Sequence, residues 1–133
     1  MSKYIPLSEP MLNGNEWQYV KECLDSGWVS SAGGFVGRFE QEIAAFLNVK
    51  HAIATVNGTA ALHIGLLLIG VQPNDEVLMP TLSFIAPANA VKYVGAYPVF
   101  IDVESDYWQI DTEQMRRFLR DECHIDSGVL RNK

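Results

Sequence analysis

The feature that most constrains the fold is an alternation of short apolar runs with helical stretches between residues 51 and 102. The apolar runs at 51–56, 76–80 and 98–102 have the length of strands, and helical patterns at 59–69 and 86–94 separate them. Pro80 suits a strand end but not a central position. Strands that follow one another through helices favour a parallel sheet with right-handed crossovers. The sequence therefore predicts an α/β fold.

Two further helices are predicted before this region. The first spans about 16–26, with Asn13 or Asn15 as its cap and Gly27 as its end. An irregular loop rich in glycine and serine follows at 28–34. The second helix, over about 35–47, carries apolar residues three and four apart, and Asn48 is a suitable stop.

The last helix has the clearest start signal in the chain. Asp111 can cap it, and Gln114 stands where a capping box places Glu or Gln. Ile110 and Met115 have the spacing of a hydrophobic staple. Beyond Arg120 the sequence turns polar.

The predicted sheet is small and one predicted helix has almost no polar face. Sheets usually have about five or six strands, and the apolar helix at 59–69 needs cover on all sides. We therefore expect either that more chain follows or that a partner buries this surface. We divide the chain into an N-terminal helical segment with a loop on the substrate side, 1–48, and the first, truncated βαβαβ part of a larger domain, 49–133.

Composition limits the class of partner. The 133 residues are 48% hydrophobic and 20% charged, with a formal net charge of -6, so the overall field does not attract nucleic acid. Cys23 and Cys123 lack metal-ligand spacing and fit reduced thiols of a cytoplasmic protein. The N-terminus has no apolar signal region, and the longest apolar run, about 64–71, is too short to span a bilayer. We therefore expect small-molecule partners, and we expect no binding of metal, nucleic acid or membrane.

The sharpest local signal is the stretch at 55–63, where a predicted strand ends, Asn57-Gly58 turns the chain and a helix begins. The first turn of a helix has free N–H groups and the positive end of its dipole, so it can hold a phosphate. Gly58 removes a side chain that would block the anion, Thr59 adds a hydroxyl donor, and Ala60 leaves its N–H accessible. A plain strand-to-helix turn capped by Thr59 explains the same residues.

Phe84 follows the predicted strand 76–80. Ligands of parallel sheets sit outside the carboxyl ends of the strands, so its ring is placed near the Gly58–Thr59 turn and could stack on a flat heteroaromatic group. A core phenylalanine is the other interpretation. Asp102 ends the last predicted strand, and we expect it to cap the loop that follows. We expect His63 to be a satisfied core histidine and Lys92 to occupy an outward-facing helix position.

Taken together, several stretches resemble the DegT/StrS family of sugar aminotransferases. They are 27–33, 57–63, Asp75-Glu76-Val77 with Pro80, and 96–102, in the family's order and with natural spacing. The residues at 28–31 and 55–59 are most similar to those of enzymes that aminate nucleotide-linked 4-keto sugars for bacillosamine-, legionaminic- or perosamine-type glycans. The resemblance implies fold type I of the pyridoxal-phosphate (PLP) enzymes, a homodimer, and glutamate as the amino donor.

The resemblance also assigns residues. Gly58, Thr59 and Ala60 match the positions that hold the cofactor phosphate, and Phe84 matches the aromatic residue that stacks on the pyridine ring. Further residues lie on the substrate side in relatives and are weaker assignments: Trp28, Ser30, Ser31 and Asn89. The Schiff-base lysine and the carboxylate that pairs with the pyridine nitrogen match no position up to Lys133. The resemblance therefore implies no catalytic residue within the chain.

Several functions stay open at this point. The complete protein would aminate a nucleotide-linked keto sugar, or would be a sugar dehydratase of the same family in which histidine replaces the lysine. The chain by itself would be an inactive fragment, or a truncated remnant that binds or dimerises. A stand-alone nucleotide-binding module is disfavoured because no G-x-G-x-x-G or GK[ST] motif is present.

Overall fold

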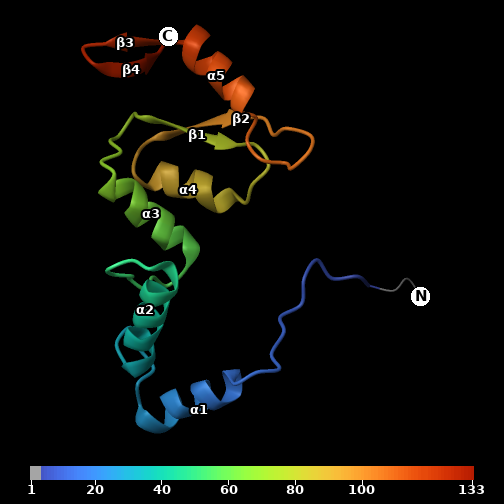
Figure 1. The fold of residues 1–133 in the computed structure, drawn as a ribbon, viewed down its shortest axis with the longest axis vertical. Helices are drawn as coiled ribbons and strands as arrows, with labels where there is room; N and C mark the ends of the chain where they lie inside the picture. The colour runs from blue at the N-terminus through green and yellow to red at the C-terminus, as the bar shows by residue number, and fades with distance from the viewer. Residues whose placement is uncertain (1–3) are drawn as a thin grey trace. The chain divides into compact units, whose positions relative to one another are not determined.

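The computed structural model describes residues 4–133, drawn in Figure 1. The chain divides into two compact units, the first ending at Ala54 and the second running from Thr55 to Lys133. The first contains two helices, and the second contains an α/β layer with a helix and a hairpin after it. The α/β class predicted from the sequence is confirmed by the parallel strands of the second unit.

The helices of the first unit lie where the sequence predicts them. α1 spans Glu16–Ser26 and ends at Gly27, whose φ of 75° is the left-handed conformation that favours glycine. α2 spans Gly34–Leu47 and ends at Asn48, also left-handed at φ 52°. Asn15 occupies the cap position of α1 but forms no side-chain cap bond.

The strand predicted at 51–56 does not form within the described residues. This segment is extended without a ladder, and the side chains of Ile53 and Val56 are 80% and 89% exposed. Glu40 holds it to α2 by accepting a hydrogen bond of 2.8 Å from the Ala54 N–H. A strand exists only when a neighbouring strand pairs with it, and the described residues supply none here. Local sequence marked the segment as apolar but could not supply its partner.

The second unit contains a two-stranded parallel sheet with two helices before and between its strands. α3 spans Gly58–Leu68, β1 spans Glu76–Pro80, α4 spans Ile85–Tyr93 and β2 spans Tyr97–Ile101. The ladder runs from the pair Glu76–Tyr97 to the pair Pro80–Ile101, so Pro80 stands at the strand end as expected. Gly95 turns the chain into β2 with a φ of 79°.

The core of this unit is small and lies between the helices and the sheet. Val91, Val94 and Ala96 are buried, and half-buried apolar residues from α3, from the segment after it and from β1 pack against them, namely Leu66, Val71 and Val77. Other faces of α3 and its end are uncovered within the described residues, with Leu68 81% and Ile69 77% exposed. This agrees with the expectation that the apolar helix needs cover from further chain or a partner.

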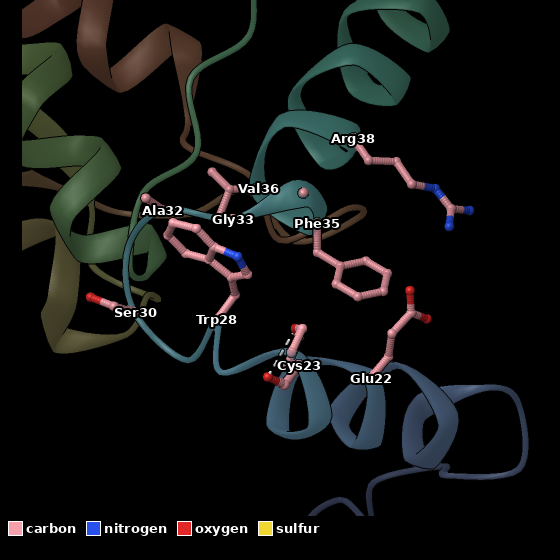
Figure 2. A pocket seen from close by; sticks show the side chains of 11 residues that line it. Glu22, Cys23, Trp28, Ser30, Ala32, Gly33, Phe35, Val36 and Arg38 are labelled. Atoms are coloured by element: carbon pink, nitrogen blue, oxygen red, sulfur yellow. Dashed lines mark hydrogen bonds between the residues drawn. The ribbon is translucent and has the colours of Figure 1, made fainter.

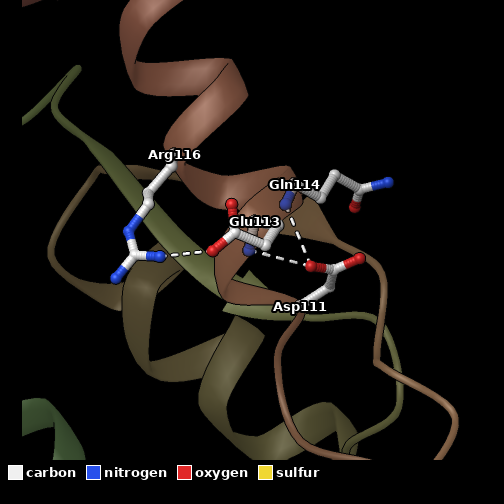
Figure 3. Close-up of polar contacts among 4 residues, drawn as sticks. All are labelled: Asp111, Glu113, Gln114 and Arg116. Carbon is white, nitrogen blue, oxygen red and sulfur yellow. Dashed lines mark hydrogen bonds and ion pairs between the residues drawn. The ribbon is translucent and has the colours of Figure 1, made fainter.

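α5 spans Thr112–Asp121, and its start is shown in Figure 3. The Asp111 carboxylate accepts hydrogen bonds of 2.9 Å from the N–H groups of Glu113 and Gln114, which confirms the predicted cap. Of the two reciprocal hydrogen bonds of the predicted capping box, the one accepted by Gln114 does not form. Gln114 accepts a bond of 2.6 Å from the Asp102 N–H instead of the Asp111 N–H, because the Asp111 N–H donates to the Asp102 carbonyl at 2.8 Å.

The polar residues after Arg120 form a hairpin that the sequence analysis did not predict. β3, Cys123–Asp126, pairs antiparallel with β4, Val129–Asn132. The turn residues Ser127 and Gly128 both have positive φ, 52° and 82°, which is the two-residue turn that suits a hairpin twist. No helix among residues 4–133 combines the length and apolarity needed to cross a membrane.

Candidate functional site

The turn at the start of α3 is built by Asn57. Its extended backbone and its side chain form the helix cap, with Oδ1 accepting a hydrogen bond of 2.9 Å from the Ala60 N–H. The Ala61 N–H donates to the Asn57 carbonyl at 3.2 Å. An asparagine before glycine at a helix start is an N-cap signal, so the capping role belongs to Asn57 rather than to Thr59.

Two backbone donors of this turn are uncommitted. Within residues 4–133 the N–H groups of Gly58 and Thr59 have no hydrogen-bond partner, and an added Cβ at Gly58 would meet nothing within 4 Å. The Ala60 N–H, in contrast, is occupied by Asn57, so it is not accessible in the way the sequence suggested. The open space and the donors at Gly58 and Thr59 suit one phosphate group at the positive end of the helix dipole.

Phe84 stands at the entrance to α4, not in the core. Its side chain is 85% exposed within the described residues, so it is not part of the core that these residues form. It lines a shallow hollow of about 250 Å³ beyond the end of β1, with Pro80, Thr81, Ser83 and Ile85 among the neighbours. An exposed ring at this edge of a parallel sheet can stack on a flat ligand.

The ends of the two parallel strands are tied together. The Thr81 hydroxyl donates to Asp102 Oδ1 at 3.1 Å, and the Thr81 N–H donates to the Ile101 carbonyl at 3.0 Å. Asp102 Oδ1 also accepts a bond of 2.8 Å from the Val103 N–H, which confirms its predicted role in capping the loop. Sequence inspection overlooked Thr81, although a threonine directly after a strand is a usual partner for such a carboxylate.

The starts of α3 and α4 face the same end of the unit. Figure 1 shows the two helices running in the same direction, and they pack on each other, with the rings of His63 and Tyr93 5.7 Å apart. The Gly58 turn and Phe84 are therefore brought to one edge of the sheet, where parallel α/β proteins bind ligands. His63 is half-buried in this helix contact, outside the buried cluster of Val91, Val94 and Ala96, so it packs on Tyr93 and is not the core histidine that was expected.

The remaining predicted residues of this unit are placed as follows. Asn89 is half-buried in α4 and makes no side-chain hydrogen bond within the described residues. Lys92 is exposed, with Nζ 3.9 Å from the centroid of the Tyr97 ring. A cation that stacks on a neighbouring ring at the surface has a structural contact of its own, which fits the outward-facing position expected for Lys92.

Three of the residues that the resemblance assigns to the substrate side, Trp28, Ser30 and Ser31, belong to the first unit. Trp28 and Ser30 line a hollow of about 430 Å³ between the end of α1 and the start of α2, shown in Figure 2. Trp28 is 60% exposed, and Ser31, also exposed, is not among the lining residues. Arg38 at the rim donates to Glu42 at 2.7 Å, and this bond, with a smaller contribution from Tyr19, holds the pKa of Arg38 above its ordinary value.

Acidic and thiol side chains do not gather into a metal site. Within residues 4–133 no group of three or more His, Cys, Asp or Glu side chains has the arrangement of a metal centre. Cys23 and Cys123 are free thiols, half-buried and in different units.

Comparison with known proteins decides the family. Residues 10–124 match the sequence profile of the DegT/DnrJ/EryC1/StrS aminotransferases. The chain belongs to this family. It is 45% identical over 115 residues to GDP-perosamine synthase of Escherichia coli O157:H7, a match that covers 86% of this chain and 32% of that protein. The corresponding Vibrio cholerae protein is 46% identical over 113 residues, covering 85% and 31%.

Solved structures of the family have the same fold. A sugar aminotransferase of Streptococcus pneumoniae, solved in its PLP form, superposes with a TM-score of 0.76 at 28% identity, covering 85% of this chain and 29% of that one. The chain thus spans about a third of the length of the relatives it matches. The family and the partial α/β fold expected from the sequence are both confirmed.

Proposed function

We propose that the complete protein transfers an amino group from glutamate to a nucleotide-linked 4-keto sugar with PLP as cofactor. The observation that carries the proposal is the Gly58–Thr59 turn, an open helix start with uncommitted donors, in a chain of the sugar aminotransferase family. The similar E. coli and V. cholerae proteins are GDP-perosamine synthases, which favours a GDP-linked sugar of a surface polysaccharide as substrate.

The residues of this chain bind the cofactor and orient it. The N–H groups of Gly58 and Thr59 and the Thr59 hydroxyl donate to the phosphate, while Asn57 keeps the turn in shape by holding the Ala60 N–H. Phe84 covers one face of the pyridine ring and excludes water from it. When bound, PLP supplies the electron sink that amino transfer requires.

For the 133-residue chain by itself we propose binding without catalysis. The chain spans 31–32% of the similar synthases. Lys92, which lies on α4 in the same unit as the proposed cofactor site, stacks outward on Tyr97. The lysine or histidine that separates an aminotransferase from a dehydratase would come from further sequence. We also propose that the complete protein is a cytoplasmic homodimer, which would supply cover for the exposed apolar faces of α3.

The test is a titration of the 133-residue chain with PLP. We expect saturable binding of PLP, measured by the change in its absorbance. Inorganic phosphate should compete with PLP for the site. Thr59→Val removes the hydroxyl donor and should weaken binding about tenfold, in line with one lost hydrogen bond to a charged group. Phe84→Leu should weaken binding without changing the competition by phosphate.

A matched control and a covalent readout complete the test. Thr112 lies in the first turn of α5 as Thr59 lies in the first turn of α3, but it follows the carboxylate cap of Asp111. Thr112→Val should therefore leave PLP binding unchanged. Borohydride treatment should fix PLP onto no single lysine. Equal affinity of the Thr59→Val chain and the unmodified chain, or one lysine labelled in high yield, would contradict the proposal.

A further inference from the structure

Asparagine followed directly by glycine occurs at two places in the chain, Asn13-Gly14 and Asn57-Gly58. In such a pair the backbone nitrogen of the glycine can attack the side-chain amide of the asparagine, because glycine has no Cβ to screen its nitrogen. Asparagine is among the thermally labile residues of proteins. The second pair forms the turn at the start of α3, whose donors we assign to the cofactor phosphate.

The backbone nitrogen of Gly58 is exposed and uncommitted. Within residues 4–133 its N–H has no hydrogen-bond partner. Apart from its own helix and its chain neighbours, no atom lies within 4 Å of the position that a Cβ would take. It also stands at the positive end of the α3 dipole, which favours the loss of a proton. The Gly14 nitrogen differs, because its N–H donates to the Glu16 carboxylate at 2.9 Å.

The side chain that this nitrogen would attack is exposed and is held at the start of α3. Asn57 Oδ1 accepts a hydrogen bond of 2.9 Å from the Ala60 N–H. Negative charge develops on this oxygen during the attack, and a fixed donor together with the helix dipole stabilises that charge. The cap that shapes the turn therefore also assists the reaction.

The backbone of Asn57 restrains the reaction. It is extended, with φ -164° and ψ 172°, and has to rotate about its Cα–C bond before the Gly58 nitrogen reaches Cγ. The rotation breaks two hydrogen bonds that the Asn57 carbonyl accepts, one of 3.2 Å from the Ala61 N–H and one of 3.1 Å from the Thr55 hydroxyl. Two such bonds slow the reaction about tenfold to a hundredfold relative to the unfolded chain, and they do not prevent it.

We propose that Asn57 is a deamidation site, and that its conversion to a carboxylate prevents phosphate binding at the Gly58–Thr59 turn. A phosphate that is already bound there protects Asn57, because it accepts the Gly58 N–H and keeps the nitrogen from attacking. The proposal concerns regulation of the cofactor site, and it rests on the proposed function for the assignment of this turn to PLP.

The reaction balances with water as its single co-reactant. The Gly58 nitrogen gives its proton to a base in the solvent and forms a bond to Asn57 Cγ. The bond between Cγ and Nδ2 breaks, and Nδ2 takes up a proton and leaves as ammonia. Water then opens the cyclic imide, either at the new bond, which gives aspartate, or at the original main-chain bond, which gives isoaspartate. No group is oxidised or reduced.

Both products disable the turn, for different reasons. Aspartate caps a helix as well as asparagine does, so α3 keeps its start. Its carboxylate, however, adds a negative charge beside the donors of Gly58 and Thr59, and this charge repels a phosphate. Isoaspartate lengthens the main chain by one methylene and displaces the carbonyl that accepts the Ala61 N–H, so the first turn of the helix loses its shape.

Peptide mapping by mass spectrometry, after incubation of the 133-residue chain at mildly alkaline pH, measures the loss of each amide. Asn13 is the reactive reference because it also precedes glycine, and Asn48 is the slow reference because the branched side chain of Val49 follows it. Asn57 should lose its amide roughly tenfold faster than Asn48, and isoaspartyl methyltransferase should label part of the product. PLP or inorganic phosphate at about ten times its Kd should slow the loss at Asn57 about tenfold and leave the rate at Asn13 unchanged.

Two substitutions that keep a capping oxygen separate the effect of charge from that of structure. Asn57→Asp reproduces one product, whereas Asn57→Ser keeps a neutral cap that cannot form the imide. Both variants should show the same helix content by far-UV circular dichroism. The aspartate variant should bind PLP about tenfold more weakly than the serine variant. A merely structural role of Asn57 would give the two variants equal affinity.

The inference is overturned if Asn57 loses its amide no faster than Asn48, if bound PLP leaves the rate at Asn57 unchanged, or if the two capping variants bind PLP equally. If PLP binds with the Thr59 dependence described above and Asn57 does not react, the inference fails and the proposed function stands. If Asn57 reacts but PLP neither binds nor protects it, the proposed function fails, and the link between deamidation and cofactor binding fails with it.

Discussion

Replacing Asp111 by alanine should destabilise α5 measurably. The Asp111 carboxylate accepts two bonds of 2.9 Å, from the N–H groups of Glu113 and Gln114, at a half-buried position. A helix of 10 residues is marginal in water without such support. Alanine leaves both donors without a protein partner at the positive end of the helix dipole.

The magnitude follows from the cap and its charge. Loss of an N-cap costs about 0.5–2 kcal/mol, and loss of the negative charge near the helix start adds about 0.3–1 kcal/mol at low salt. We expect Asp111→Ala to cost about 1–3 kcal/mol in total, with a fall in Tm of about 4–11 °C. Asp111→Asn keeps an acceptor and loses only the charge, so it should cost less than half as much.

Two assays separate a local from a global effect. Urea unfolding followed by far-UV circular dichroism gives the free energy of unfolding, and hydrogen exchange of the Glu113 and Gln114 amides reports on the cap itself. Glu113→Gln is the control in the same turn, because it removes a negative charge and the exposed ion pair with Arg116 but leaves the Asp111 cap in place; an exposed pair is worth under about 1 kcal/mol. If Asp111→Ala and Glu113→Gln were equally stable, or the two amides exchanged at unchanged rates, the cap would not carry the stability assigned to it.

Two further predictions concern the loop after β2 and the turn before it. Hydrogen bonds from backbone N–H groups, Gln109 first, hold the pKa of Glu104 below its ordinary value of 4.5, so its stabilising contribution is complete above pH 4.5 and is lost as pH falls through the lower folded pKa. Glu104→Gln should therefore flatten the acid limb of an unfolding titration, and an unchanged limb would contradict this. Gly95→Ala should destabilise by about 1–3 kcal/mol, because φ is +79° and the new Cβ would stand 3.1 Å from the Pro73 Cβ. Gly65→Ala, in a helix with nothing within 4 Å, should instead stabilise by about 0.5–1 kcal/mol in the same urea assay, and equal signs for the two variants would refute the reasoning.

The helices were predictable because their signals are local. Gly27, Asn48 and Gly95 mark ends that the structure places in left-handed backbone, and Asp111 caps α5 as its position before the helix indicated. A capping bond joins residues two or three positions apart, so the sequence around the helix end contains both partners. The hairpin after Arg120 also has a local signal, Ser127-Gly128, which the polar composition of its strands concealed.

Part of the candidate site was predictable for the same reason. An apolar run that ends in Asn57-Gly58 before a helical stretch indicates an anion-binding turn, and the structure shows open donors there at Gly58 and Thr59. The sequence did not indicate which side chain takes the Ala60 N–H, because Asn57 and Thr59 are both capable of capping, and the structure assigns it to Asn57. Family resemblance added the identity of the anion, which no single turn specifies.

By itself, the sequence determined the α/β class, the position of each helix and the turn at Gly58–Thr59. Only the tertiary structure decided that residues 51–56 lack a strand partner, that Gln114 bonds Asp102, and that Phe84 is exposed. It also decided that Trp28 and Phe35 line one hollow between α1 and α2. The physical reason is the separation along the sequence of the residues in contact. Caps and turns join near neighbours, whereas strand pairing, burial and hollows depend on which distant segments meet.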